Sequence, residues 1–144
     1  MMYLGCDHGG FESKEEIKKY LDKKKIRYFD LGPHDIDNED DYPDYALKVA
    51  KEVAKGPANK GILICGTGIG MSMTANKVKG VRASLCYDEN TAKLSREHND
   101  TNVLCLGGRT TPKDKALKIV DVWLNTPFSN VDRHKRRVEK MNKL

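Results

Sequence analysis

A cysteine followed by a glycine-rich turn is the feature of this sequence that most clearly points to chemistry. Residues 65 to 72 read Cys-Gly-Thr-Gly-Ile-Gly-Met-Ser, with glycines at Gly66, Gly68 and Gly70. Glycines let the backbone approach a ligand closely and direct several N–H groups toward it. A helix beginning near Gly70 would add its positive end and stabilise a thiolate at Cys65. The pattern predicts an anion-binding turn, although a tight packing turn with a buried cysteine remains an alternative.

Two other phosphate-binding loops do not fit this turn. No Gly-Lys-Ser/Thr follows it, as a Walker loop requires. A phosphatase loop needs an arginine six residues after the cysteine, where Met71 stands. The first loop, residues 7–10, reads Asp-His-Gly-Gly and lacks the Gly-x-Gly-x-x-Gly of dinucleotide sites.

Polar side chains also follow other predicted strands. Asp7 and His8 come after the first strand, and Arg109 comes after the fifth. We expect His98 and Asn99, which end the helix after the fourth strand, to lie on the same carboxyl side. Because ligands bind beyond the carboxyl ends of parallel strands, these residues could share one crevice. An isolated histidine is also common as a surface or capping residue.

The C-terminal segment is basic, since six of the twelve residues from 133 to 144 are lysine or arginine. Arg133 and Arg137 lie one helical turn apart, so both can bind one phosphate group. A nucleic-acid surface is the alternative interpretation of this charge. Few aromatic residues accompany it, which favours a small anion.

Short apolar runs alternate with helical patterns along the whole chain. The runs predict five strands: Met2–Cys6, Arg27–Leu31, Gly61–Cys65, Val81–Cys86 and Val103–Leu106.

The helical patterns occupy the segments between and after these runs. They predict helices at Glu12–Lys24, from Tyr42-Pro43 to Gly56-Pro57, from near Gly70, at Glu89–Glu97, after Thr111-Pro112, and at about 132–143. This alternation predicts one α/β domain over residues 1–144, a three-layer Rossmann-like sandwich with a five-stranded parallel sheet and helices on both faces. Trp123 could serve the core or an interface.

Composition excludes several classes of protein. The 144 residues are 38% hydrophobic and 33% charged, with a net charge of +5 and a mean hydropathy of −0.67. No apolar stretch approaches 18 residues, and the first seven residues lack the basic start of a secretory signal. We therefore expect a cytoplasmic protein.

Two further composition patterns point to structure more than to chemistry. The four cysteines show no C-x-x-C spacing, so we expect reduced, structural thiols, with Cys65 as the exception. Six of the ten residues from 35 to 44 are acidic, which favours a solvated loop over a metal site.

Several stretches together resemble the ribose-5-phosphate isomerase B family, which includes the bacterial galactose-6-phosphate isomerase subunits. They cover nearly the whole chain, and the Cys-Gly-Thr-Gly and His-Asn-Asp-Thr-Asn blocks are specific as a pair. The stretches are residues 5–8, 41–46, 61–70, 75–77, 95–102 and 133–138.

The resemblance implies a metal-independent aldose–ketose isomerase of the pentose phosphate pathway, without a cofactor, acting on ribose 5-phosphate and ribulose 5-phosphate. It implies that Cys65 is the base that moves a proton between C2 and C1 of the sugar. Thr67 and the N–H groups of residues 66–70 would hold the enediolate. Asp7 and His98 would help to open the furanose ring. One branch of the family has a glutamate base where this chain has Met71, so the thiol branch is the match.

The same resemblance implies a binding set and an oligomer. The phosphate would be held by His8, Arg109, Arg133 and Arg137, and Tyr42 and Asn99 would line the pocket. Family members are dimers or tetramers with shared sites, in which His98, Asn99 and Arg109 come from the neighbouring subunit. Neither a nucleic acid nor a membrane is an expected partner.

Three alternatives remain at this stage. Galactose-6-phosphate or allose-6-phosphate isomerase is the alternative within the family. A non-catalytic sugar-phosphate or nucleotide sensor would keep the arginines without requiring Cys65, Thr67 and His98 together. A nucleic-acid-binding module would use the basic tail.

Overall fold

The computed structural model describes the whole chain, residues 1–144, and its centre is one parallel β-sheet. The strand order is β2-β1-β3-β5-β4, and every neighbouring pair is parallel. This confirms the predicted α/β class. The strands are β1 Met2–Cys6, β2 Tyr28–Asp30, β3 Lys60–Cys65, β4 Ala83–Leu85 and β5 Val103–Gly107.

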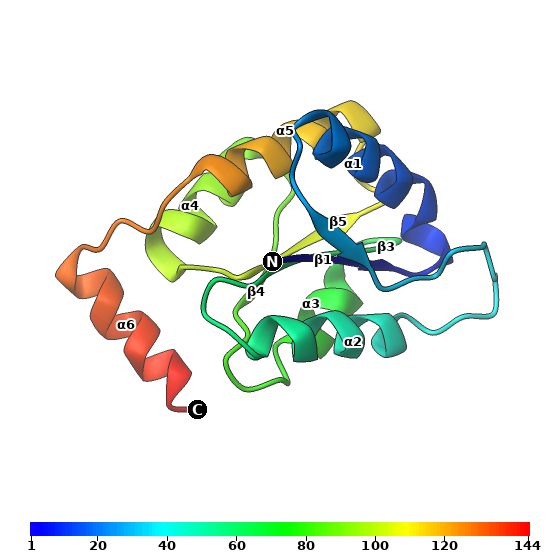
Figure 1. Cartoon of the computed structure of the whole chain (residues 1–144). Coiled ribbons are helices and arrows are strands. Elements are labelled where there is room, and N and C mark those ends of the chain that lie inside the picture. Colours follow the sequence, from blue (N-terminus) through cyan, green and yellow to red (C-terminus); the bar gives the residue numbers. More distant parts are fainter.

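Helices cover both faces of the sheet, as Figure 1 shows. Helices α1, α4 and α5 lie on one face, and α2 and α3 lie on the other, whereas α6 projects beside the sheet. None of the helices is both long and apolar enough to span a membrane. The helices are α1 Phe11–Lys23, α2 Tyr42–Ala54, α3 Ile69–Ala75, α4 Glu89–Asn99, α5 Lys113–Asn125 and α6 Asp132–Asn142, with a 3₁₀ turn at His8–Gly10.

The alternation of side chains along β3 divides the core into two clusters. Ile62 and Ile64 pack with residues of α1 and α5, and Leu63 and Cys65 pack with residues of α2 and α3. Apolar side chains on both faces are typical of a central parallel strand. Trp123 is fully buried in the first cluster, so it belongs to the core of its own chain.

The predicted edge strands are longer than the observed ones. β2 and β4 each contain three residues, against five and six in the predictions. Each is an edge of the sheet and pairs with only one neighbour. An apolar run in the sequence therefore predicts where an edge strand lies, but not how many of its residues pair with the neighbouring strand.

The direction of α4 determines which edge of the sheet its last residues reach. The helix begins beyond the carboxyl end of β4 and ends just before β5 begins. The carbonyl oxygen of Asn102 accepts a hydrogen bond from the N–H of Gly61, at the start of β3 (2.9 Å). The C-terminus of α4 therefore lies at the amino edge of the sheet.

A buried ion pair joins α1 to the end of β2. The ammonium of Lys14 is fully buried, donates to Asp30 Oδ1 (2.8 Å) and also donates to the carbonyl oxygen of Pro33 (2.5 Å). Burial opposes ionisation of Asp30, but hydrogen bonds from Lys14 and Lys18 outweigh it and lower the pKa of this carboxyl.

We predict that Asp30→Ala lowers the free energy of unfolding by about 3–5 kcal/mol, because it leaves the Lys14 charge buried without its partner. Since the pKa of Asp30 is lower in the folded chain, the pair stabilises fully above the ordinary value of 3.8 and fades as the pH falls below it. Urea titrations at pH 7 and pH 3 measure both effects. Glu16→Ala, which removes an exposed ion pair with Lys19, should cost far less, because solvent screens that pair. Equal losses for the two variants would contradict the prediction.

Candidate active site

Three loops meet at the carboxyl edge of the sheet, after β1, β3 and β5. The N–H of Gly108 donates to the carbonyl oxygen of Cys65 (2.7 Å), and the N–H of Arg109 donates to that of Gly66 (2.9 Å). A Cβ atom built on Gly9 would lie 2.9 Å from the backbone nitrogen of Gly66. These contacts fix the glycine-rich turn between its two neighbours.

The sulfur of Cys65 lies inside this turn. Its Sγ accepts a hydrogen bond from the N–H of Gly68 at 3.1 Å, and the residue is 5% exposed. Gly68 has a φ of +79°, and a Cβ there would lie 2.8 Å from the backbone carbon of Leu106. Glycine is therefore required for the turn that directs this N–H toward the sulfur. A donor aimed at the sulfur stabilises negative charge on it.

The other three cysteines are in a different environment. All four are free thiols, and Cys6, Cys86 and Cys105 are at most 1% exposed. Burial raises the pKa of Cys6 to about 12 and raises those of Cys86 and Cys105. Of the four, only Cys65 accepts a hydrogen bond from a backbone N–H. Cys65 also packs in the core, and its hydrogen bond from the Gly68 N–H is what distinguishes it from the other three thiols.

Tyr42 and Thr67 border the turn. A Cβ on Gly70 would lie 2.5 Å from atoms of the Tyr42 ring, so the absence of a side chain at Gly70 gives this ring its place. Thr67 is exposed, and its Oγ1 accepts a hydrogen bond from the N–H of Ile69 (3.3 Å). Both predicted residues therefore lie with Cys65 on the same edge of the sheet.

Asp7 is buried at the end of β1, where its Oδ1 accepts a hydrogen bond from the N–H of Gly10 (3.2 Å). Burial raises the pKa of its carboxyl, while the positive charge of His8 and the N–H groups of Gly9 and Gly10 act in the opposite direction. A raised pKa suits a carboxyl group that exchanges protons with a substrate.

His8 contacts a residue of the acidic segment. Its Nδ1 lies 2.6 Å from Oδ1 of Asp40, and its backbone N–H donates to the same oxygen (3.1 Å). Together with Asp7, these side chains offer three potential metal ligands within 4.8 Å of one another. Two ligands of one ion, each about 2.1 Å from it, lie about 3 Å or more apart. The closer spacing of His8 and Asp40 fits a hydrogen-bonded pair.

Arg109 belongs to the same group of loops. Its Nη1 lies 3.1 Å from the position of a Cβ on Gly66, and with His8 it lines a cavity of about 290 Å³. We expected Arg109 to come from a neighbouring subunit. The structure instead places it beside Cys65 of its own chain, because β5 ends at the same edge as β3.

The expectation that His98 and Asn99 lie on the carboxyl side is wrong. α4 runs back along the sheet, so its last two residues lie at the amino edge, beside the start of β5. About 13 Å of strand separates Gly61, at that edge, from Cys65. Within one chain, these two residues cannot reach the sulfur.

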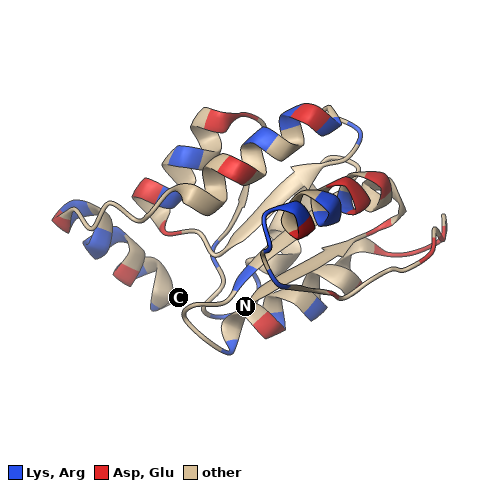
Figure 2. Ribbon diagram, turned by 45° about the horizontal axis from the view of Figure 1, so that its top comes forward, with Lys and Arg blue, Asp and Glu red and all other residues tan.

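Arg133 and Arg137 also lie away from Cys65. The segment leading to α6 is bonded to α4 through the N–H of Ser129 and the carbonyl oxygen of Glu97 (3.1 Å). The His134 ring lies against that of His98, with ring centroids 4.3 Å apart and the ring planes tilted by 37°. Figure 2 shows the basic α6 and the acidic segment after β2 at opposite ends of the molecule. Burial and three positive neighbours, His98, Arg133 and Arg137, lower the pKa of His134.

The predicted residues therefore form two groups at opposite edges of the sheet. The carboxyl-edge group consists of Asp7, His8, Tyr42, Cys65, Gly66, Thr67, Gly68, Gly70 and Arg109. The amino-edge group consists of His98, Asn99, Arg133 and Arg137.

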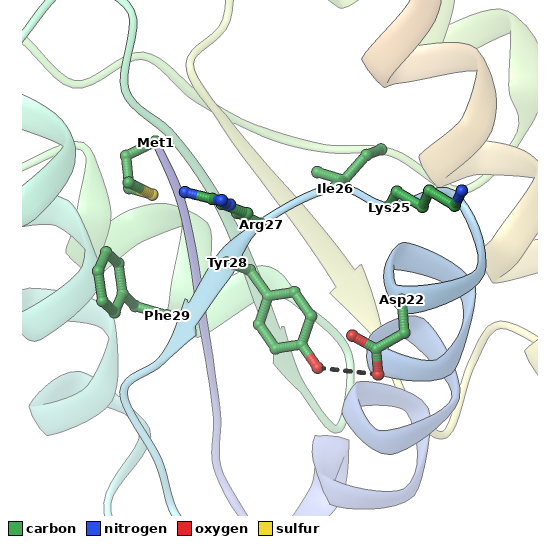
Figure 3. A pocket seen from close by; sticks show the side chains of 7 residues that line it. All are labelled: Met1, Asp22, Lys25, Ile26, Arg27, Tyr28 and Phe29. Carbon is green, nitrogen blue, oxygen red and sulfur yellow. Dashed lines mark hydrogen bonds between the residues drawn. The ribbon is translucent and has the colours of Figure 1, made fainter.

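Two larger cavities lie apart from the sulfur. One of about 610 Å³ lies at the start of β1 and β2 and is lined by Met1, Asp22 and residues 25–29 (Figure 3). Another, of about 500 Å³, lies at the amino edge and includes Asn99, Arg82 and Asn142. Neither contains a carboxyl-edge residue.

Sequence reasoning assigned no role to Asp40 or His134. Asp40 is one of six acidic residues among the ten from 35 to 44, and nothing in this sequence pattern indicates that its side chain turns inward. His134 lies between two residues of the basic tail, and one turn before Val138, which is also buried. That spacing is the signal by which its burial could have been found.

This fold and these loops define a class: α/β proteins that bind a small anionic ligand beyond the carboxyl ends of a parallel sheet. The sequence model of the Ribose/Galactose Isomerase family matches residues 2–141. The chain belongs to this family.

Individual relatives agree with the family match. The chain is 46% identical over 136 residues to ribose-5-phosphate isomerase B of Escherichia coli, covering 94% of this chain and 90% of that protein. It resembles the solved ribose-5-phosphate isomerase B of Mycoplasma genitalium with bound ribulose-5-phosphate, with a TM-score of 0.96, 45% identity, and coverage of 99% and 93%. The structure of ribose-5-phosphate isomerase B of Clostridium thermocellum matches with a TM-score of 0.94 and 46% identity, covering 99% of this chain and 95% of that chain.

Proposed function

We propose that this chain interconverts D-ribose 5-phosphate and D-ribulose 5-phosphate, because its relatives in Escherichia coli and Mycoplasma genitalium are ribose-5-phosphate isomerases B. The observation that carries the proposal is the sulfur of Cys65 within the turn of N–H groups. In the cytoplasm, this reaction belongs to the pentose phosphate pathway. Free thiols at all four cysteines are typical of a reducing compartment.

The proposed reaction is a proton transfer through an enediolate. The thiolate of Cys65 removes the proton from C2 of the open-chain aldose, and the electron pair of that bond forms the enediolate. The hydroxyl proton of O2 moves to O1 while the sulfur returns a proton to C1, which leaves a carbonyl at C2 and yields the ketose. Backbone N–H groups of residues 66–70 and the Thr67 hydroxyl stabilise the enediolate oxygen, an interaction that typically contributes about 10²–10³ in rate per donor. Asp7 and His98 exchange protons with the ring oxygen and hydroxyl as the furanose opens.

The phosphate binds apart from the reacting carbons. His8 and Arg109 hold it from one chain, and Arg133 and Arg137 hold it from another. Such remote contacts align C1 and C2 with the base. Tyr42 and Asn99 line the pocket between them. The reaction needs neither a cofactor nor a metal ion in this scheme.

Two copies of the chain are required for this site. His98 and Asn99 lie about 13 Å or more from the sulfur of their own chain. A two-fold axis would bring the amino edge of one copy to the carboxyl edge of the other and complete two equivalent sites. Exposed apolar side chains near the turn supply a surface for this contact: Tyr42, Ile69, Met73 and Tyr87. We therefore propose a homodimer, or a homotetramer made of two such dimers. Each chain contributes one isomerase domain that spans residues 1–144.

The substrate test compares five- and six-carbon sugars. We predict that kcat/KM for ribose 5-phosphate exceeds those for allose 6-phosphate and galactose 6-phosphate by at least about tenfold, since one extra carbon in a fitted pocket costs about 1–3 kcal/mol. Progress curves with EDTA should match those without it. Higher kcat/KM for a six-carbon sugar would move the chain to the other activity of the family. Loss of turnover with EDTA would exclude the metal-independent scheme.

A further inference from the structure

One residue of the acidic segment differs from its neighbours. Asp35, Asp37, Glu39 and Asp41 are exposed, whereas the side chain of Asp40 is only 5% exposed. It turns toward the end of β1 and not toward solvent.

Asp40 bonds His8 twice through one oxygen. Its Oδ1 accepts a hydrogen bond from the backbone N–H of His8 (3.1 Å) and lies 2.6 Å from the ring Nδ1. A carboxylate is an acceptor only, so the hydrogen of this second bond belongs to Nδ1. Nε2 is then the ring nitrogen left free for a ligand.

His8 borders a cavity in which the proposed function places the phosphate. His8 lines the cavity of about 290 Å³ that also contains Gly108 and Arg109. Ile36 and Asn38, from the segment that carries Asp40, form part of its wall. The second carboxylate oxygen, Oδ2, is buried without a hydrogen-bond partner. Burying this oxygen without a partner costs desolvation free energy. A functional role for the Asp40–His8 pair would explain why the carboxylate is nevertheless buried.

We propose that Asp40 is a positioning residue that fixes the His8 ring, with its hydrogen on Nδ1, so that Nε2 faces the phosphate of the substrate. The proposal rests on the proposed function, because that function places a phosphate beside His8 and Arg109. When His8 is protonated, the carboxylate of Asp40 offsets the added charge while Nε2–H donates to the phosphate. The pair also anchors the acidic segment to the wall of the cavity.

The test compares Asp40→Asn and Asp40→Ala with the wild-type protein. We expect KM for ribose 5-phosphate to rise about tenfold in Asp40→Ala, with kcat within about twofold, because a charge-assisted hydrogen bond to the binding residue is lost. Asp40→Asn keeps the shape and loses the charge, so its KM should lie between the two. The affinity for inorganic phosphate, measured by calorimetry, should fall in the same order.

Two controls separate positioning from general stability. Asp35→Asn removes an exposed charge from the same segment and should leave KM and phosphate affinity within about twofold. In a His8→Ala background, Asp40→Ala should change neither value further, since the residue acts through His8. Nitrogen-15 NMR of the His8 ring should show hydrogen on Nδ1 in the wild type and a mixture of tautomers in Asp40→Ala.

The results that would overturn the inference differ from those that would overturn the function. Unchanged KM and phosphate affinity in both Asp40 variants would exclude a positioning role, as would an equal loss in the His8→Ala background. If Asp40→Ala does not fold, the isosteric Asp40→Asn still decides. If the wild type does not convert ribose 5-phosphate, the proposed function fails, while phosphate affinity and the His8 tautomer still test the pair.

Discussion

Cys65→Ala should bind ribose 5-phosphate with nearly unchanged affinity and convert it about 10²–10⁴-fold more slowly than the wild type, the range typical for loss of a positioned base. The reason is chemical: alanine cannot accept a proton, and no other thiol lies in the turn. The side chain is small and 5% exposed, so its removal leaves in place His8 and Arg109, the residues proposed to hold the phosphate. Steady-state rates give kcat, and calorimetry with a slowly converted analogue gives the affinity.

A matched control is available in the chain. Cys86 is the residue after β4, and its buried thiol contacts Ser84 and Ser95. Cys86→Ala should therefore lower the free energy of unfolding without changing kcat by more than about twofold. If Cys65→Ala keeps more than a tenth of the wild-type kcat, the sulfur is not the base. An equal loss of kcat in Cys86→Ala would indicate that the effect is structural.

Mixing two inactive variants should restore activity. Cys65→Ala and His98→Ala homodimers each lack one component of every site. In the proposed dimer, each site takes Cys65 from one chain and His98 from the other, so one site of a mixed dimer contains both changes and the other contains neither. Random exchange of subunits gives half mixed dimers with one intact site each, so about a quarter of the wild-type activity should return.

The arrangement of the sheet is the reason for expecting this recovery. Cys65 ends β3 at the carboxyl edge, and His98 lies near the end of α4, at the amino edge. Cys65→Ala mixed with His8→Ala provides the contrast. These two residues lie on neighbouring loops of one chain, and a mixed dimer would hold one defect in each site. No recovery in the first mixture would contradict a site shared between chains.

The sequence predicted the elements, and which residues meet at the carboxyl edge of the sheet, for physical reasons. Apolar runs between helical patterns locate buried strands, and a parallel sheet brings the residues after its strands to one edge. Cys65 is the last residue of β3, and Asp7 and Arg109 lie within two residues of the ends of β1 and β5. The structure brings these strand ends and their loops together. Tyr42 lies at the same edge because its ring packs against Gly70, a contact that strand order alone does not predict.

The misplaced residues have an equally physical explanation. His98 and Asn99 end a helix and do not follow a strand, and a crossover helix runs antiparallel to the strands of the sheet. The sequence interpretation took account of the order of the elements but not of the direction of this helix. It therefore placed His98 and Asn99 at the wrong edge of the sheet. The inward turn of Asp40 depends on a contact with His8, 32 residues away, and no local pattern encodes it.

The most direct test of the central claim follows the transferred proton. Wild-type protein incubated with ribose 5-phosphate in deuterium oxide should yield ribulose 5-phosphate that carries deuterium at C1, because the Cys65 thiol exchanges with solvent between accepting and returning a proton. Cys65→Ala should show this exchange at least about 10²-fold more slowly. Undiminished conversion and exchange in Cys65→Ala would contradict proton transfer by this sulfur.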